Sequence, residues 1–211
     1  EYDQNPSVNY DPTSGVSWCT CANTSGYIDS YYIRVDINGV VVMTTTTMMS
    51  DPAATDGMQV SWVDTPSNRL ILIYKKSSTG YLYGTSAAIS GTGSGASLGA
   101  WSTPIIFSTS YYNYNNYAMS AVYVPSLNRG YFTTTNPSNR YGMMGICYWD
   151  AGTSAMFFEN TTQPLYWNYD VNYHPPDMAL AANGQIALVN GSNAAYAGTR
   201  AYNITPSATT I

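Results

Sequence analysis

The chain has 211 residues, of which 45% are hydrophobic and only 9% are charged, and its net charge is −5 at pH 7. Globular proteins usually carry about 25% charged residues, so Ser, Thr, Asn and Tyr must supply much of the polar surface. No basic cluster exceeds Lys75-Lys76, which argues against nucleic-acid binding, and no apolar run approaches the ~18 residues of a membrane span. This composition is typical of a protein that works outside a cell or on a particle.

The sequence starts at Glu1 without an initiator methionine or a signal-peptide pattern, and we expect a processed chain or an excerpt of a longer one. Cys19 and Cys21 lie two residues apart in a strand-like run, so they share a face and cannot easily pair with each other. We expect buried free thiols here and at Cys147. A disulfide to Cys147 and a metal site are the alternatives.

Short runs rich in Val, Ile, Tyr, Thr and Trp alternate with clusters of Gly, Pro, Asn, Asp and Ser, and no long window has helical periodicity. This pattern predicts an all-β protein. Four hairpins are expected in chain order, with the strand anchors Tyr10, Trp62, Tyr123 and Leu180 recurring about every 55 residues. The hairpins cover residues 7–22, 59–74, 120–135 and 177–191.

The predicted hairpin turns have the sequences DPTSG, DTPSNR, PSLNR and ANGQ, whose residues suit tight turns. Asp11 and Asp64 occupy matching positions and are expected to cap their turns. Arg69 and Arg129 also match, and we expect them to brace the turns, because a catalytic group rarely recurs in every repeat.

Each hairpin is followed by a predicted third strand, and three of the four repeats also have a predicted fourth strand. Four strands per repeat indicate a β-propeller-like array of about four four-stranded blades in a single domain, with a β-sandwich or jelly roll as the alternative. The fourth repeat is short, so ITPSATTI or EYDQ would have to supply its outer strand, unless the chain is an excerpt of a larger ring. The ranges are 31–37, 81–89, 141–148 and 196–203 for third strands, 40–46, 103–108 and 154–159 for fourth strands, and about 7–56, 57–117, 118–174 and 175–211 for the repeats.

The segments PSVNYDPTSG, VSWVDTPSNRLILIYKKSSTGYLYG and AVYVPSLNRGYF resemble the propeller-type repeats of phage tail fibres and other virion-surface proteins. The second repeat matches best, the first and third depart at the Gly/Ser hairpin that occupies residues 91–95 of the second, and the fourth is degenerate. The resemblance implies a structural or receptor-contacting virion protein and does not by itself imply catalysis.

In a propeller, the loops between repeats and the loops between second and third strands lie on one face. The loop YYNYNNY at residues 111–117 and the loop after residue 165 belong to that face. Tyrosine supplies a large contact area at low entropy cost. We therefore expect contacts to a protein partner or to sugars there, with packing between blades as the alternative. The predicted contact residues are Tyr111, Tyr112, Tyr114, Tyr117, Tyr166, Trp167 and Tyr169.

Few residues suit catalysis. The chain has five arginines and two glutamates, and Glu159 has no carboxylate partner at a readable spacing. A glycosidase needs two facing carboxylates, which Asp150, Asp170 or Asp177 could supply only through the fold. His174 is expected to be a loop residue. We expect no catalytic residue, no cofactor and no metal.

The sequence therefore predicts a non-enzymatic structural or binding protein on a phage or virus particle, such as a fibre, spike or decoration protein. Its expected partners are other virion or filament proteins, further copies of itself and glycans. The alternatives are a secreted microbial surface or filament subunit assembled through its terminal strands, and a glycan-acting enzyme. The sequons at Asn23, Asn160, Asn190 and Asn203 matter only if the source glycosylates its surface proteins.

Overall fold

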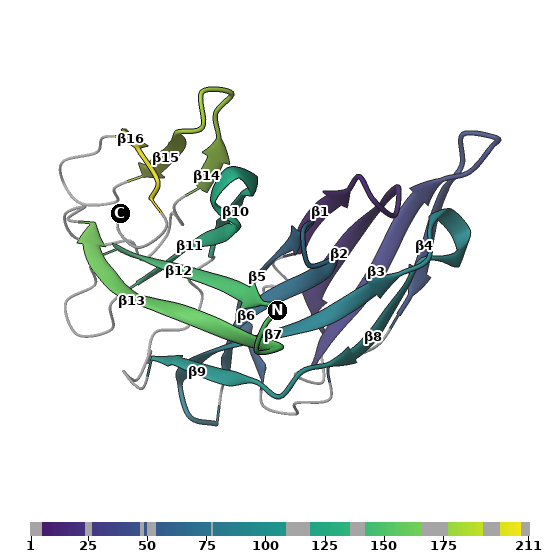
Figure 1. Ribbon diagram of the computed structural model, residues 1–211, viewed down its shortest axis with the longest axis horizontal. Coiled ribbons are helices and arrows are strands. Elements are labelled where there is room, and N and C mark those ends of the chain that lie inside the picture. Colours follow the sequence, from purple (N-terminus) through teal and green to yellow (C-terminus); the bar gives the residue numbers. More distant parts are fainter. Residues whose placement is uncertain are drawn as a thin grey trace.

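The computed structural model describes residues 6–23, 27–46, 49, 54–76, 78–108, 119–135, 142–165, 177–191 and 199–207. In this part of the chain, the strands form four antiparallel sheets of three to five strands (Figure 1). Two short 3-10 turns lie between strands. The prediction of an all-β protein is confirmed. No helix of the described part is long and apolar enough to cross a membrane.

The first two sheets are formed by consecutive strands, each antiparallel to the next. The outer edge of the second sheet is split, because β8 and β9 pair with opposite halves of β7. The single outer strand predicted at residues 103–108 is therefore wrong in extent, and β9 supplies only half of that edge. The strands are β1 (Ser7–Asp11), β2 (Val16–Ala22), β3 (Ile28–Val35), β4 (Val41–Thr45), β5 (Ala54–Asp64), β6 (Arg69–Lys76), β7 (Tyr81–Ser90), β8 (Ser97–Trp101) and β9 (Ile105–Ser108), and Gly93–Gly95 is a 3-10 turn.

The third sheet has four strands, and the fourth sheet has three. Within the described residues, the last strand of the fourth sheet pairs only with its predecessor, and residues 205–207 that follow it form no strand. The strands are β10 (Ala121–Val124), β11 (Arg129–Thr135), β12 (Gly142–Asp150), β13 (Ala155–Leu165), β14 (Asp177–Leu180), β15 (Ile186–Gly191) and β16 (Thr199–Ile204), and Pro125–Leu127 is a 3-10 turn.

The strand register shows that one of the predicted strand anchors, Trp62, is wrong by one residue. The first turns of the first three sheets are closed by the equivalent pairs Asp11–Val16, Asp64–Arg69 and Val124–Arg129. The residues one position before these pairs are Tyr10, Val63 and Tyr123. Trp62 is therefore not equivalent to Tyr10, and it points to the opposite face of its strand because side chains alternate along a strand. The aromatic content of the run concealed this shift in the sequence.

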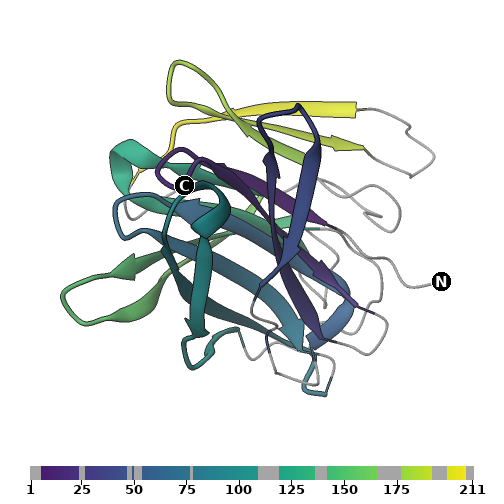
Figure 2. The same ribbon diagram turned by 90° about the vertical axis from the view of Figure 1, so that its right-hand side faces the viewer.

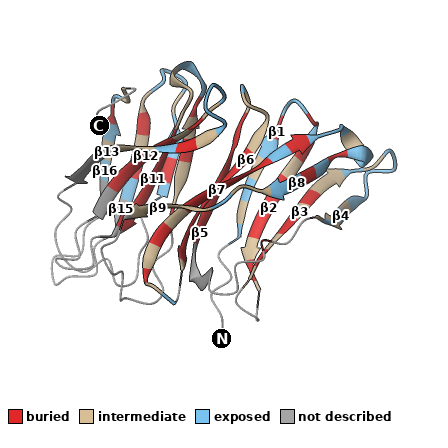
Figure 3. Cartoon of the chain, turned by 60° about the horizontal axis from the view of Figure 1, so that its bottom comes forward, coloured by how far each residue is buried: buried red, intermediate tan, exposed pale blue. Residues whose placement is uncertain are grey.

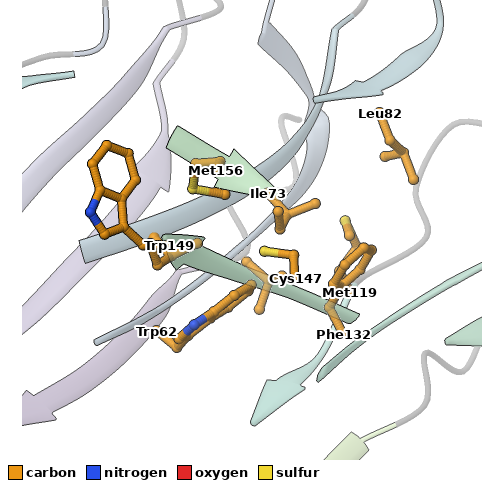
Figure 4. Close-up of a cluster of buried hydrophobic side chains, with 10 residues drawn as sticks. Trp62, Ile73, Leu82, Met119, Phe132, Cys147, Trp149 and Met156 are labelled. Atoms are coloured by element: carbon orange, nitrogen blue, oxygen red, sulfur yellow. The ribbon is translucent and has the colours of Figure 1, made fainter. Parts of the chain in front are cut away.

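Hydrophobic cores lie between successive sheets. Between the second and third sheets, Trp62 stacks on Phe132 with ring centroids 6.5 Å apart (Figure 4). Between the first and second sheets, Trp18 packs in one cluster with Leu70. Between the third and fourth sheets, residues including Ile146 pack with residues including Leu188. Each sheet thus buries the face that the next sheet covers, since no single sheet can bury its own apolar residues.

The sheets follow one another in chain order, and the first and fourth sheets lie at opposite ends of the molecule (Figure 1). Burial is greatest in the middle, where β6 has six consecutive buried residues (Figure 3). Strand β4 of the first sheet alternates instead between exposed and half-buried residues. Figure 2 looks onto the first sheet and shows the β3–β4 hairpin in front of the other strands. In the part of the chain that the structure describes, each of the two outermost sheets therefore packs against one neighbouring sheet.

Candidate functional site

One end of the sheets carries the tight turns. In an antiparallel sheet of consecutive strands, the first and third connections lie at the same end. We call this end the turn face. It comprises the first turns at residues 12–15, 65–68, 125–128 and 181–185 and the third connections at residues 36–40, 91–96 and 151–154.

The seven predicted contact residues lie outside the described residues. They are Tyr111, Tyr112, Tyr114, Tyr117, Tyr166, Trp167 and Tyr169. Their role therefore stays a prediction, and so does the loop assignment of His174. The candidate site is built instead on the turn face.

Aspartates cap the first turns, as predicted. The carboxylate of Asp11 is buried and accepts hydrogen bonds from the Thr13 amide at 2.9 Å and from the Ser14 hydroxyl at 2.5 Å. The equivalent Asp64 is also buried and accepts a bond from the Tyr123 hydroxyl of the next sheet at 3.2 Å. A buried carboxylate needs such partners, so these aspartates stabilise the turns and the contact between sheets.

The other candidate carboxylates also cap local structure. Asp150 accepts bonds from the Gly152 amide and the Thr153 hydroxyl, both at 2.9 Å. Asp177 accepts a bond from the Ser120 hydroxyl at 3.0 Å and lies in the fourth sheet. Asp170 lies outside the described residues. Each described aspartate of this set therefore has a structural role of its own.

The two matching arginines differ in what they reach. Arg69 donates from Nε to the Ser86 hydroxyl at 3.0 Å, and its guanidinium lies 3.7 Å from the centre of the Trp149 ring in the third sheet. Burial lowers the pKa of Arg69. The side chain of Arg69 therefore links β6 to β7 and to the next sheet, and the predicted bracing of its own turn stays a prediction.

Arg129 turns back onto its own sheet. It donates to the carbonyl oxygens of Leu127 at 3.4 Å and Asn128 at 3.1 Å, which braces the turn as predicted. Its guanidinium also lies 3.6 Å from the centre of the Tyr148 ring, and it forms an ion pair with Glu159 at 3.5 Å. A single arginine therefore links the turn to an aromatic ring and a carboxylate.

Phe157 extends this arrangement toward the surface. Its ring stacks on that of Tyr148 with centroids 5.6 Å apart and planes 19° from parallel, because the two residues are directly paired across β12 and β13. Phe157 is 38% exposed. We call Arg129, Tyr148, Phe157 and Glu159 the arginine–aromatic ladder. It combines one exposed aromatic ring with a cation and an anion at its side.

Phe157 is the exposed member of the ladder, whereas Arg129, Tyr148 and Glu159 are half-buried, and the exposure of Phe157 is related to the short fourth sheet. In the first pair of sheets, the Ser14 carbonyl accepts a bond from the Gly93 amide at 2.8 Å, so a first turn meets the third connection of the next sheet. The Arg69–Trp149 stack repeats this contact between the second and third sheets. The described part of the fourth sheet contains no such third connection, because it ends after three strands. Sequence reasoning missed the ladder, because the exposure of its aromatic ring depends on what the neighbouring sheet lacks.

Tyr123 is a half-buried hydrogen-bond donor at the turn face. The pKa of the Tyr123 hydroxyl is raised by burial and by the adjacent Asp64 carboxylate. A phenol of this kind stays protonated at neutral pH and donates a hydrogen bond. The described residues contain no group of three or more His, Cys, Asp and Glu that could hold a metal ion. The three cysteines are free thiols, with Cys19 and Cys147 buried and Cys21 half-buried.

Neither a protein-family model nor a curated protein matches the sequence. Solved structures do resemble the fold. A mutant of AofleA from Arthrobotrys oligospora, with three arginines replaced by alanine, is similar at a TM-score of 0.58 and 13% identity, over 95% of this chain and 54% of that one. A mutant of the NanB sialidase from Streptococcus pneumoniae is similar at a TM-score of 0.57 and 12% identity, over 88% and 27%.

The intramolecular trans-sialidase from Ruminococcus gnavus is similar at a TM-score of 0.52 and 12% identity, over 94% of this chain and 42% of that one. This chain thus spans about half of AofleA and about a quarter of NanB. At such low identity the likeness concerns the fold alone.

Proposed function

We propose that the protein is a non-enzymatic binding protein on the outside of a particle or cell, and that it contacts carbohydrate through the arginine–aromatic ladder. The single observation that carries this proposal is the stack of Arg129, Tyr148 and Phe157 beside Glu159, with Phe157 exposed. The low charge content and the resemblance to virion-surface repeats favour a phage or virus particle as the setting.

We further propose that the four sheets are blades of a β-propeller-like array. Each sheet is an antiparallel run of consecutive strands, and successive sheets pack face to face in chain order. That arrangement is expected of propeller blades, which leave only short edges exposed. The similarity of fold to sialidases is consistent with a scaffold that handles carbohydrates, although those proteins are much longer than this chain.

The ladder suits a sugar because it offers two kinds of contact in one place. The exposed ring of Phe157 provides a flat apolar surface, and an aromatic ring contributes a large contact area. Arg129 and Glu159 provide charged donors and acceptors, whose hydrogen bonds are about twice as strong as neutral ones. A sugar ring with one apolar face and hydroxyls at its rim would satisfy both.

A glycan array carrying neutral and sialylated oligosaccharides, followed by calorimetry with the best hit, tests the proposal. Phe157→Ala should weaken binding by about tenfold or more, equivalent to ~1.4 kcal/mol, in a protein that stays folded at the assay temperature. Its melting temperature should fall, because the substitution also removes the stack on Tyr148, and it is measured alongside. Ile106→Ala is the matched control, since Ile106 is an exposed apolar residue of another sheet at 49% exposure.

Three results would contradict the proposal. The array could show no binding by the wild-type protein. Binding could be equally weakened by Ile106→Ala, which would indicate a general surface effect. Release of free sugar from the bound oligosaccharide, followed by chromatography, would identify an enzyme.

A further inference from the structure

The first sheet presents an apolar face that the described chain does not cover. Ser7 and Asn9 of β1 bond to Ser61 of the second sheet, with the Asn9 amide 2.8 Å from the Ser61 carbonyl oxygen. Because side chains alternate along a strand, Val8 and Tyr10 point away from the second sheet. They are 55% and 65% exposed.

The same side of the first sheet carries further exposed apolar residues. They belong to β3 and β4 and are paired across these strands, which places them on one face. We call this surface, formed by Val8, Tyr10, Val35, Val41 and Met43, the first outer face. An exposed apolar patch on one continuous sheet face marks a site of interaction.

Equivalent positions in the later sheets indicate what the first outer face contacts. The closing pairs of the first turns make Val8 and Tyr10 equivalent to Ser61 and Val63 of the second sheet. Ser61 and Val63 are 1% and 5% exposed because they pack against the first sheet. The first outer face therefore occupies the positions through which this chain's sheets contact the sheet that precedes them.

Tyr123 of the third sheet also contacts the preceding sheet from the equivalent position. It is equivalent to Tyr10, and its hydroxyl donates to Asp64 of the preceding sheet. Both later sheets thus use this position for the contact. Tyr10 has the same place in its sheet, but no sheet precedes it in the structure.

The opposite end of the stack offers a complementary surface. In the fourth sheet, Met178 and Leu188 pack toward the third sheet. Their neighbours along the strands, Ala179, Ala187 and Val189, point the other way, and Ala179 and Val189 are exposed. This last outer face consists mainly of small residues, whereas the first outer face contains larger ones.

The chain already joins sheets by placing large residues against small ones. Gly130 of the third sheet lies against the indole of Trp62 in the second sheet, and a Cβ at Gly130 would overlap that ring. Gly145 of the third sheet lies against Phe107 of the second sheet, and also against Phe132 of its own sheet. Packing of Tyr10 or Met43 against alanines of the last outer face would place large side chains against small ones in the same manner.

We propose that the first outer face is an interface between copies of this chain, on which the last outer face of a second copy stacks. The junction would continue the order of sheets across two molecules. The two faces favour a second copy as the occupant, because the first outer face has the positions that join successive sheets within the chain and the small residues of the last outer face complement its larger ones. Such a heterologous contact gives a closed ring if the rotation closes and a filament if it does not.

Light scattering coupled to size-exclusion chromatography tests the interface over a range of protein concentrations. The wild-type chain should show a mass of at least two copies. Tyr10→Lys changes the first outer face and Ala179→Glu changes the last one, and each should yield monomers with unchanged circular dichroism. Ile37→Lys is the control, because Ile37 is 99% exposed in the β3–β4 turn and outside both faces, and this variant should associate like the wild type.

A mixing experiment distinguishes the proposed contact from a symmetric one. The Tyr10→Lys chain retains an intact last outer face and the Ala179→Glu chain retains an intact first outer face, so the mixture should form 1:1 dimers. Association that is lost in Tyr10→Lys but kept in Ala179→Glu would mean that two first sheets face each other, which overturns the proposal. A monomeric wild type, or a mixture that stays monomeric, also overturns it. Further repeats of a longer chain would then be the occupant to test.

Discussion

At the scale of single residues, the contact between the second and third sheets depends on the absence of one side chain. Gly130 follows the turn-bracing Arg129 at the start of β11, and the indole of Trp62 lies where its Cβ would be. Trp62 and Phe132 are almost fully buried in the same core. The tryptophan therefore has little room to move if a methyl group is added.

Gly130→Ala should lower the free energy of unfolding by about 1–3 kcal/mol, the usual cost of overpacking a well-packed core. Gly99→Ala is the matched control, because Gly99 also lies in a strand and is exposed. A Cβ added at Gly99 would lie 3.7 Å from the nearest atom, the Ala88 carbonyl oxygen. Urea denaturation followed by tryptophan fluorescence measures both. Equal stability of the two variants would show that Trp62 can shift at no cost.

At the scale of elements, the sheets are fastened to one another at the turn face as well as through their cores. Arg69 lies at the end of the first turn of the second sheet and stacks on Trp149 near the third connection of the third sheet. Its Nε bond to Ser86 fixes the side chain in that direction. The pair therefore couples two sheets that contact each other mainly through apolar residues.

A double-mutant cycle with Arg69→Gln and Trp149→Leu should give a coupling free energy of about 0.5–2 kcal/mol, the range of cation–π contacts from exposed to desolvated sites. Thermal or urea unfolding of the four proteins measures it. Lys76→Gln with Tyr83→Leu is the comparison cycle, because that cation is 5.6 Å from the ring centre and both residues belong to the second sheet. A coupling no larger than in the comparison cycle would assign the Arg69 contact to packing alone.

The sequence was sufficient to predict the hairpins, because turns leave a local chemical pattern. Asp11, Asp64, Arg69 and Arg129 were matched correctly from turn residues alone, and the strand pairs confirm their equivalence. The position of Trp62 was wrong by one residue. A run of alternating apolar residues leaves two registers open. The turn residues decide between them, because Tyr10 and Val63 directly precede the equivalent Asp11 and Asp64.

The candidate site was less predictable than the fold. Arg69 and Arg129 have the same place in their repeats, yet one reaches Trp149 in the next sheet and the other reaches Tyr148 in its own sheet. This difference arises because the fourth sheet has three strands in the described part, so nothing there corresponds to Trp149. A local pattern carries no information on what the neighbouring sheet lacks.

At the scale of the whole molecule, stacked sheets should differ in local stability according to how many faces are covered. The second and third sheets have neighbours on both sides, and β6 is buried over six consecutive residues. Among the described residues, the first and fourth sheets each have a neighbouring sheet on one side only. Since local unfolding is easiest where few apolar contacts are lost, the end sheets should open first.

Hydrogen exchange with mass spectrometry should therefore find the slowest exchange in peptides from β6 and β11, and faster exchange in β1–β4 and β14–β16. Raising the protein concentration should slow exchange in the two end sheets and leave the middle sheets unchanged, because association of copies would cover the outer faces. Tyr10→Lys should abolish this concentration dependence while keeping the ranking measured in dilute solution. End sheets that exchange as slowly as β6 in dilute solution would contradict the expected stability gradient. A concentration dependence that persists in Tyr10→Lys would instead place the contact between copies elsewhere on the molecule.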